Sequence, residues 1–357
     1  MPISRECRHS DRDSLRDTSG SRHSGVNALW IPIGMPDLRF DPLRREWVAY
    51  ATERNDRTFL PTNFCPLCPS GPHGQSEVPL DDFEVVVFEN RFPALGPDRV
   101  GDRPVRPPST GCEVVVYTPE HDLTLAHLSP ERMRLLIDVW ADRYLDLGSR
   151  PEVRYVYIFE NKGEEVGVTL HHPHGQIYAL PFVPPLVDAE LRAARDHIKT
   201  SGRCLHCDEI ARELSGPRTV FADSSVVAFV PHAARWPYEV HVYPRRHVGS
   251  IAELDTQGRD ELADAILRTA RAYDRHFGFS TPYVMAMHQA PTDGGHWPEA
   301  HLHVEFYPPH RRPDRLKYLA GVEIGAGTFV NDTRPEDTAA QLRQAVEAHA
   351  SNPTGSA

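Results

Sequence analysis

The sequence predicts an α+β protein made of two similar halves, which form a mainly antiparallel sheet or half-barrel with flanking helices. Three observations lead to this prediction. A Cys-x-x-Cys pair opens each half, a His-x-His run closes each half, and strand-like and helix-like segments follow the same order between them. With 357 residues, 40% of them apolar, the chain is long enough to bury the core of such a duplicated fold.

In the first half, three segments rich in β-branched and aromatic residues are bounded by Pro and Gly, which is typical of strands. They cover residues 85–88, 113–117 and 155–159. Between the last two, residues 129–147 carry apolar side chains at helical spacing, as in Met133, Leu136 and Trp140. The pattern therefore predicts an antiparallel sheet with one helix crossing it.

The second half repeats this order. Strand-like segments cover residues 226–229, 239–243 and 283–287, and a helical pattern covers residues 258–277. The alternative is chance similarity among common strand sequences. The conserved order of the Cys pair, a single His and the His-x-His run favours duplication.

The domain boundaries follow from this repeat. Residues 36–190 form the N-terminal half, with the candidate nucleophile and a zinc site, and residues 191–345 form the C-terminal half. Residues 1–35 are polar and lack apolar periodicity, which predicts a disordered extension, and Met35 is an alternative start. Residues 331–343 have helical composition, and residues 346–357 are predicted to be a flexible tail.

Charge and hydropathy limit the possible partners. The net charge of −11 argues against nucleic acid and anionic membranes, because phosphate neutralisation needs a basic surface. No segment has the roughly 20 apolar residues of a membrane span, and the N-terminus lacks the apolar centre of a secretion signal. These features predict a cytoplasmic protein.

The run His172-Pro-His174-Gly-Gln176 carries the chemistry that the sequence suggests. A neutral imidazole is a competent nucleophile near pH 7, because its reference pKa is about 6.5. His174 is the candidate nucleophile toward phosphorus. Gln176 can donate a neutral hydrogen bond to a phosphate oxygen without offering a proton to water, which favours transfer over hydrolysis.

The cysteine pairs have the spacing of metal ligands. Cys65 and Cys68 can occupy adjacent corners of a tetrahedron, and a reducing cytosol favours metal over a disulfide. His121 and His172 would complete a closed, structural set. Internal repetition predicts a second zinc site of the same kind from the counterparts of these four residues, which are Cys204, Cys207, His247 and His301.

The His-Pro-His-Gly-Gln run and its surroundings resemble the galactose-1-phosphate uridylyltransferase family, a branch of the histidine-triad superfamily. The likeness covers most of residues 39–345. It implies zinc at Cys65, Cys68, His121 and His172, histidine-triad-like halves and a homodimer. It also implies ping-pong exchange, in which UDP-glucose uridylylates His174, glucose 1-phosphate leaves, and galactose 1-phosphate takes the uridylyl group as UDP-galactose.

The resemblance also implies substrate contacts. Asn90 resembles the asparagine of the family's uridine pocket, and Asn161 and Thr169 resemble the residues that hold the diphosphate. Arg54 and Arg57 resemble two arginines that act from the neighbouring subunit.

The sugar-binding segment of the family is matched in part. Lys317 and Glu323 continue the likeness, but Phe329 stands where the best-known members have a sugar-contacting Gln. The resemblance therefore leaves the hexose specificity open.

A second metal, iron or zinc, is also implied by the resemblance. Its ligands would be Glu190, His288 and His303, with Glu305 in place of the family's fourth His. This set shares no residue with the duplicated zinc site, so the sequence allows both to exist in one chain.

Three other functions stay open at this point. The chain could be a related phosphorylase using an ADP-sugar or a dinucleoside polyphosphate, against which Asn90 argues only mildly. It could be a non-catalytic, zinc-stabilised nucleotide-binding protein, which the intact His174 and Gln176 argue against. It could also be a nucleotide hydrolase, which Gln176 disfavours.

Overall fold

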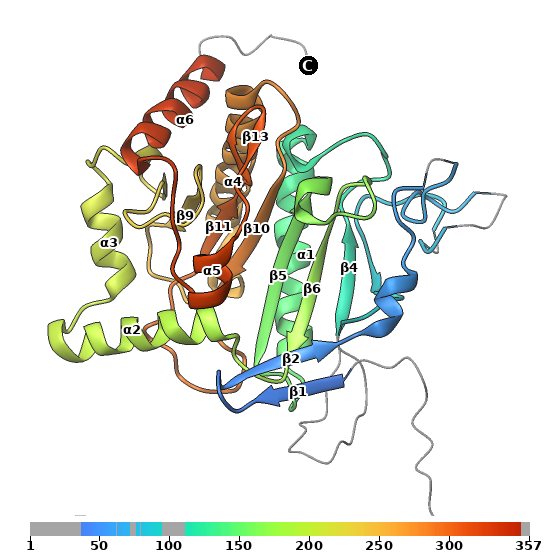
Figure 1. The fold of residues 1–357 in the computed structure, drawn as a ribbon, viewed down its shortest axis with the longest axis horizontal. Helices are drawn as coiled ribbons and strands as arrows, with labels where there is room; N and C mark the ends of the chain where they lie inside the picture. Colours follow the sequence, from blue (N-terminus) through green and yellow to red (C-terminus); the bar gives the residue numbers. More distant parts are fainter. Residues whose placement is uncertain (1–36, 62, 72–75, 79, 95–110, 351–357) are drawn as a thin grey trace, which may run out of the picture. The chain divides into compact units, whose positions relative to one another are not determined.

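The computed structural model describes residues 37–61, 63–71, 76–78, 80–94 and 111–350, and within them one large antiparallel sheet dominates (Figure 1). Its nine strands lie in the order β3-β4-β6-β5-β10-β11-β9-β8-β7. Their bounds are β3 Val86–Glu89, β4 Cys112–Val116, β5 Tyr155–Lys162, β6 His174–Leu180, β7 Thr219–Ala222, β8 Val226–Phe229, β9 Val240–Pro244, β10 Tyr283–His288 and β11 His303–Tyr307.

The strand order shows the internal duplication directly. The first half has the order β3-β4-β6-β5 and the second has β8-β9-β11-β10, with β7 added at its edge. The halves meet where β5 pairs antiparallel with β10, so they are related by an approximate twofold axis between these strands. The sheet is open, with β3 and β7 at its edges. The predicted duplicated α+β fold is confirmed, with one continuous sheet and no closed barrel.

Two long helices cover one face of the sheet and form its main core. They are α1 (Pro130–Gly148) and α4 (Thr256–Phe277), which pack against each other (Figure 1). Ser129 and Asp255 cap their N-termini by accepting hydrogen bonds from backbone N–H groups of the first turn. Trp140 and Tyr273 are among the fully buried side chains between helices and strands. Both helices lie within two residues of their predicted bounds.

Helices that the sequence analysis did not predict join the two halves. They are α2 (Pro185–Ser201) and α3 (Leu205–Glu213), which begin just after β6. On α2, Val187, Leu191 and Ala194 lie on one buried face. Short strands and further helices complete the described chain: β1 Asp37–Asp41, β2 Glu46–Tyr50, β12 His310–Arg312, β13 Arg315–Leu316, α5 Gly321–Ala326, α6 Pro335–Ala350, and the 3-10 helices η1 Thr52–Asp56, η2 Leu125–His127, η3 Glu164–Val166 and η4 Ile251–Glu253.

The two halves differ by one residue in the register of a strand pair. His174 lies opposite Val116, but its counterpart His303 lies in register with Tyr243, since Val304 pairs with Val242. A shift of one residue reverses the face on which each side chain lies. On the face of the sheet opposite α1 and α4, here called the open face, β4 therefore carries Val114 and β9 carries His241.

Predictions for the chain ends lie outside the described residues. These are the disordered extension at 1–35 and most of the tail at 346–357; α6 itself extends to Ala350, beyond the helical segment expected at 331–343. None of the described helices is both long enough and apolar enough to cross a membrane.

Candidate active site

His174 begins strand β6 on the open face of the sheet, opposite the face that α1 and α4 cover. Its Nδ1 lies 2.7 Å from the backbone carbonyl oxygen of His172. Because a carbonyl only accepts, Nδ1 carries the proton and Nε2 keeps its lone pair. Burial lowers the pKa of His174 and outweighs this hydrogen bond, which acts in the opposite direction. The imidazole is therefore neutral at pH 7 and has a free nucleophilic nitrogen.

Gln176, two residues further along β6, lies on the same face as His174. Its Oε1 accepts hydrogen bonds from Asn90 Nδ2 and from the Tyr178 hydroxyl, both at 3.3 Å. The Tyr178 hydroxyl in turn accepts a hydrogen bond of 2.9 Å from Arg54 Nη1. The structure thus brings Asn90 and Gln176 together, adds Tyr178, which the sequence analysis missed, and places Arg54, which was expected to act on the neighbouring subunit, against Tyr178 of its own chain.

A cavity of about 440 Å³ opens beside His174. Asn161 and Lys162 line it, and Lys162 forms an ion pair of 3.2 Å with Asp274. Continuing the pairing of Phe159 with Gln176 places Asn161 opposite His174. The backbone carbonyl of Thr169, in the loop before the His run, accepts a hydrogen bond from Leu60. The Asn161 side chain and the imidazole of His174, the candidate nucleophile, therefore line the same cavity.

Gly175 is required by the packing beneath this strand. A Cβ atom at this position would collide with the Tyr117 hydroxyl and lie 3.0 Å from the Phe159 carbonyl oxygen. The strand approaches its neighbours too closely for any other residue. Gly175 thus lets β6 pack closely against Tyr117 and Phe159, which fixes the positions of His174 and Gln176 on either side of it.

Two pairs of predicted substrate residues bind each other. Arg57 Nε donates to the Arg54 carbonyl at 3.1 Å, and burial and the Arg54 charge lower the Arg57 pKa. Both arginines lie beside Tyr178 of their own chain. The Lys317 ammonium lies 3.2 Å from the Glu323 carboxylate. None of these four side chains is among the described residues that line the cavity beside His174. Phe329 packs under Arg235, whose guanidinium lies 5.1 Å from the ring centroid.

The first predicted metal set comes together. Ligand atoms of Cys65, Cys68, His121 and His172 lie within 4.8 Å of one another. His172 Nε2 donates to the Thr118 carbonyl at 2.8 Å, so the Nδ1 lone pair faces the two sulfur atoms at 3.8 and 3.6 Å. Burial lowers the His172 pKa to about 4, which keeps the ring neutral. Burial and the neighbouring Cys65 raise the Cys68 pKa to about 12, so a second thiolate there requires a cation.

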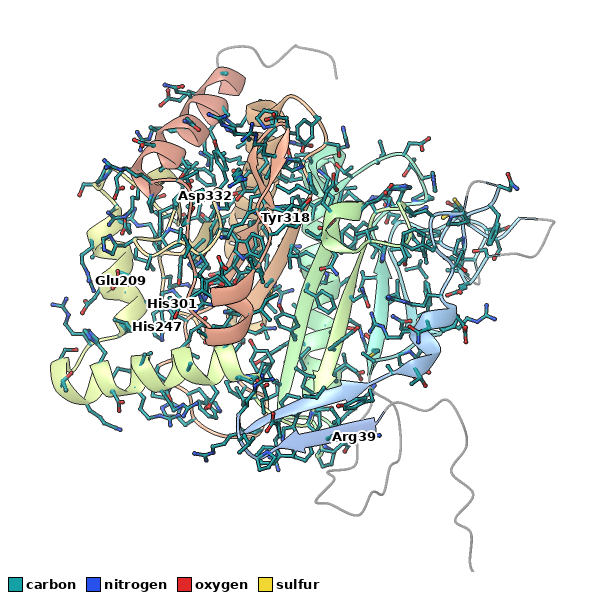
Figure 2. All side chains as sticks on the ribbon, viewed as in Figure 1. Arg39, Glu209, His247, His301, Tyr318 and Asp332 are labelled. Atoms are coloured by element: carbon teal, nitrogen blue, oxygen red, sulfur yellow. The ribbon has the colours of Figure 1, made fainter. Side chains whose placement is uncertain are left out.

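The second predicted cysteine set repeats this geometry. Cys204, Cys207, His247 and His301 also have ligand atoms within 4.8 Å, and Figure 2 shows His247 and His301 together next to α2 and α3. His301 Nε2 donates to the Pro244 carbonyl at 2.9 Å, and its Nδ1 faces Cys207 Sγ at 3.7 Å. Despite its burial, hydrogen bonds from the two imidazoles lower the Cys204 pKa to about 5. Burial and Cys204 raise the Cys207 pKa to about 12.

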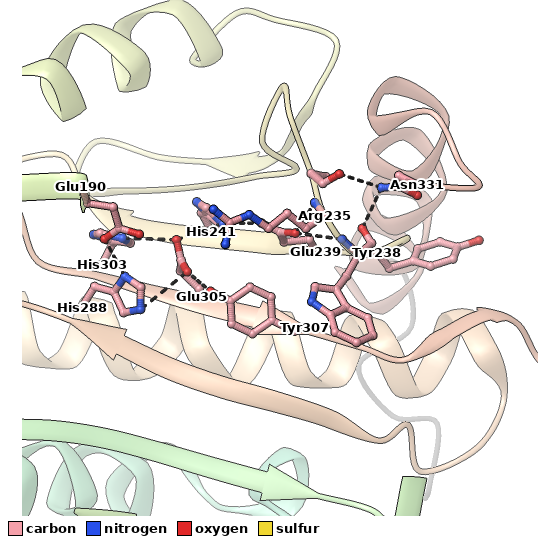
Figure 3. A network of polar contacts seen from close by, with 12 residues as sticks. Glu190, Arg235, Tyr238, Glu239, His241, His288, His303, Glu305, Tyr307 and Asn331 are labelled. Atoms are coloured by element: carbon pink, nitrogen blue, oxygen red, sulfur yellow. Dashed lines mark hydrogen bonds and ion pairs between the residues drawn. The ribbon is translucent and has the colours of Figure 1, made fainter. Parts of the chain in front are cut away.

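A third cluster, drawn in Figure 3, holds the second metal set that the resemblance implied. Glu190, His288 and His303 have ligand atoms within 4.8 Å, and Glu305 lies 3.4 Å from His303 Nε2 and 3.7 Å from His288 Nε2. Against the effect of burial, the carboxylates of Glu305 and Glu190 raise the His288 pKa to about 9. His241, which had no predicted role, lies between Glu239 at 2.9 Å and Glu305 at 3.1 Å. The register shift on β9 explains why the sequence did not reveal it.

A half-buried, neutral imidazole thus lies beside an amide and a cavity on one half of a duplicated sheet, and comparison with known proteins gives the class of enzyme. Models of the N-terminal and C-terminal domains of galactose-1-phosphate uridyl transferase match residues 30–184 and 190–354. The galactose-1-phosphate uridylyltransferase of Thermotoga maritima is 38% identical, covering 87% of this chain and 98% of the relative. The enzyme of the same name from Streptomyces lividans is 38% identical, covering 94% and 93%.

A solved structure described as a uridylyltransferase is 36% identical and superposes with a TM-score of 0.79, covering 87% of this chain and 99% of the other. The chain belongs to the galactose-1-phosphate uridylyltransferase family of nucleotidyltransferases.

Proposed function

We propose that the chain transfers the uridylyl group of UDP-glucose to galactose 1-phosphate through a covalent intermediate on His174. The observation that carries this proposal is the fixed tautomer of His174, whose Nδ1 proton is held by the His172 carbonyl at 2.7 Å. That contact directs the free Nε2 lone pair away from the backbone. The relatives named galactose-1-phosphate uridylyltransferase match nearly the whole chain, which supports the choice of substrates.

Both half-reactions balance without an external acid or base. Nε2 of His174 attacks the α-phosphorus of UDP-glucose, and the bond from phosphorus to the bridging oxygen breaks, so that glucose 1-phosphate leaves with the electron pair. The imidazole then carries a positive charge, which the His172 carbonyl stabilises through the Nδ1 proton. A phosphate oxygen of galactose 1-phosphate attacks the same phosphorus, the P–N bond breaks, and the neutral imidazole returns.

The remaining residues are proposed to bind substrate. Gln176 donates to a non-bridging oxygen of the α-phosphate, where negative charge develops. Asn90 binds the uridine, and Asn161 and Thr169 hold the diphosphate. Arg54 and Arg57 supply positive charge near it. Lys317 and Glu323 belong to the sugar-binding segment, with Phe329 as a determinant of hexose choice.

The metal sites are proposed as structural. The paired thiols and neutral imidazoles of Cys65, Cys68, His121 and His172 fit tetrahedral zinc. Cys204, Cys207, His247 and His301 fit a second zinc in the same way. The mixed nitrogen and oxygen donors of Glu190, His288, His303 and Glu305 fit zinc or iron. Bound zinc would lock the backbone at His172, two residues from the nucleophile, and supplies no step of the transfer.

The state and location of the enzyme also remain proposals. We infer a cytoplasmic location, because paired thiols at metal spacing suit a reducing compartment. We infer a homodimer from the resemblance to the family. Exposed apolar residues around α5, among them Tyr318 and Ile324, with exposed fractions of 74% and 72%, offer a surface for the second subunit.

The test of this function is labelling with UDP-glucose that is radioactive in the uridylyl group. We expect acid-labile label on the wild-type chain, its release as UDP-galactose on addition of galactose 1-phosphate, and no label on His174→Gly. Labelling from an adenine nucleotide alone would assign the chain to another nucleotidyltransferase. Faster consumption of UDP-glucose without acceptor than with it would make the chain a hydrolase.

A further inference from the structure

Tyr178 lies two residues beyond Gln176 on the same strand face, and its hydroxyl donates a hydrogen bond to Oε1 of the Gln176 amide. Asn90, just after β3, donates a second hydrogen bond from Nδ2 to the same oxygen. We infer that Tyr178, together with Asn90, is a positioning residue that holds Gln176 with its N–H end toward the substrate phosphate. This inference rests on the proposed function, since it concerns how Gln176 acts on the uridylyl phosphate.

The contact with Arg54 fixes the direction of the Tyr178 hydroxyl. Arg54 Nη1 lies 2.9 Å from the hydroxyl oxygen, and a guanidinium has only donors. The Tyr178 oxygen therefore accepts from Arg54, and its own proton is left to donate. The nearest partner for that proton is Gln176 Oε1 at 3.3 Å.

A backbone contact independently fixes Asn90. The N–H group of Phe92 donates to Asn90 Oδ1 at 2.8 Å, so the carbonyl end of this side chain faces the backbone. The Asn90 amide must then present its N–H end to Gln176, which has to answer with an acceptor. Two separate chains of donors, starting from a guanidinium and from a backbone amide, thus require the same orientation of the Gln176 amide.

This orientation decides the fate of the intermediate. With the N–H end toward phosphorus, Gln176 stabilises the negative oxygens during transfer. With the amide reversed, Oε1 would repel those oxygens and would accept a hydrogen bond from a nearby water. In that water's attack, its oxygen forms a bond to phosphorus, the P–Nε2 bond breaks, UMP leaves, and one proton passes to solvent. Tyr178 therefore favours transfer to the sugar phosphate over transfer to water.

The first test is Tyr178→Phe, which removes the hydroxyl and keeps the ring. One neutral hydrogen bond corresponds to about a fivefold effect, so the rate of His174 uridylylation should fall about fivefold with an unchanged KM for UDP-glucose. The fraction of uridylyl-enzyme lost to water should rise about fivefold in the same assay. The control is Tyr157→Phe, because Tyr157 pairs with Tyr178 on the same face and is not proposed to touch Gln176. It should change neither quantity.

A double-mutant cycle shows whether Tyr178 acts through Gln176. In a Gln176→Ala background, Tyr178→Phe should have no further effect on the uridylylation rate. Three results would each overturn the inference. The first is that the effects of Tyr178→Phe and Gln176→Ala on the uridylylation rate multiply in the double variant. The others are an unchanged partition of the uridylyl group between water and acceptor in Tyr178→Phe, and an equal change in Tyr157→Phe. Wild-type labelling keeps the two proposals distinguishable: absence of uridylyl label on the wild-type chain refutes the proposed function, whereas normal labelling with independent mutational effects refutes only the role of Tyr178.

Discussion

The two halves each place a histidine at the start of equivalent strands, β6 and β11, but the side chains around the two histidines differ in chemical type. The first site has His174 with the amides of Asn161 and Gln176, and the matching positions of the second site hold His303 with His288 and Glu305. Each amide of the first site is thus replaced by an ionisable group in the second. Both histidines donate from Nδ1 to the carbonyl two residues earlier, at 2.7 and 2.8 Å. The orientation of the imidazole was retained, and its surroundings determine what it can do.

The consequence is chemical. Around His174, neutral amides can accompany a phosphate without repelling it or protonating it. Around His303, the carboxylates of Glu190 and Glu305 would repel a phosphate, and the same negative charge raises the His288 pKa to about 9. The comparison teaches that two adjacent side chains decide whether the same fold position suits the proposed nucleophile or the proposed cation ligand.

The largest test of this comparison removes the two histidines in turn. His174→Ala should lower turnover by about 10⁴-fold or more, because no other group takes over the covalent step. His303→Ala should cost less than about tenfold and should lower the bound metal instead. Steady-state kinetics and metal analysis on the same preparations measure both. Equal losses of turnover would show that the second site takes part in the chemistry.

The next test makes the first site resemble the second. Gln176→Glu places a carboxylate beside the phosphate, and we expect kcat to fall by about 10²- to 10³-fold. The reverse change, Glu305→Gln, should leave uridylyl label at His174 only, because His303 would still lack the second amide: His288 lies where Asn161 lies in the first site. Peptide mapping of labelled protein checks this. Label on His303 in Glu305→Gln would mean that one amide is sufficient.

The two cysteine sets allow the same substitution in each half. Cys65→Ser and Cys204→Ser should each remove about one zinc per chain. Only Cys65→Ser should also lower turnover, by roughly tenfold, because the ligand His172 lies two residues before His174. Cys204→Ser should mainly lower the melting temperature, by roughly 5 °C. An unchanged zinc content in Cys204→Ser would refute the duplicated site.

Much of this comparison could be predicted from the sequence, because its signals are local. Strand and helix segments follow from short patterns, and both Cys2His2 sets follow from spacing and order. The one-residue shift in register between β4 and β9 could not, because it depends on the pairing of distant strands. It brings His241 and Glu239 toward the third cluster, that of Glu190, His288, His303 and Glu305. The contact of Arg54 with Tyr178 joins residues 124 positions apart, and no local pattern indicates it.

The smallest test concerns the buried face beneath the two sites. Glu160 of β5 lies where Met287 lies in β10, and burial raises the pKa of Glu160 to about 8. A carboxyl whose pKa is higher in the folded state than in the unfolded state stabilises the fold at low pH. That contribution is lost as the pH rises from about 4.5 to about 8.

Glu160→Gln keeps a polar group near Tyr283, whose hydroxyl lies 3.4 Å from the carboxyl, and removes the charge. We expect its melting temperature to exceed that of the wild type by a few degrees at pH 8.5 and by less at pH 5, since roughly 1–3 kcal/mol of the ionisation penalty disappears. Glu164→Gln, in the exposed 3-10 helix just after β5, is the control. A difference between Glu160→Gln and wild type that does not grow with pH would show that the first half tolerates this buried charge, and that its contrast with Met287 has no effect on stability.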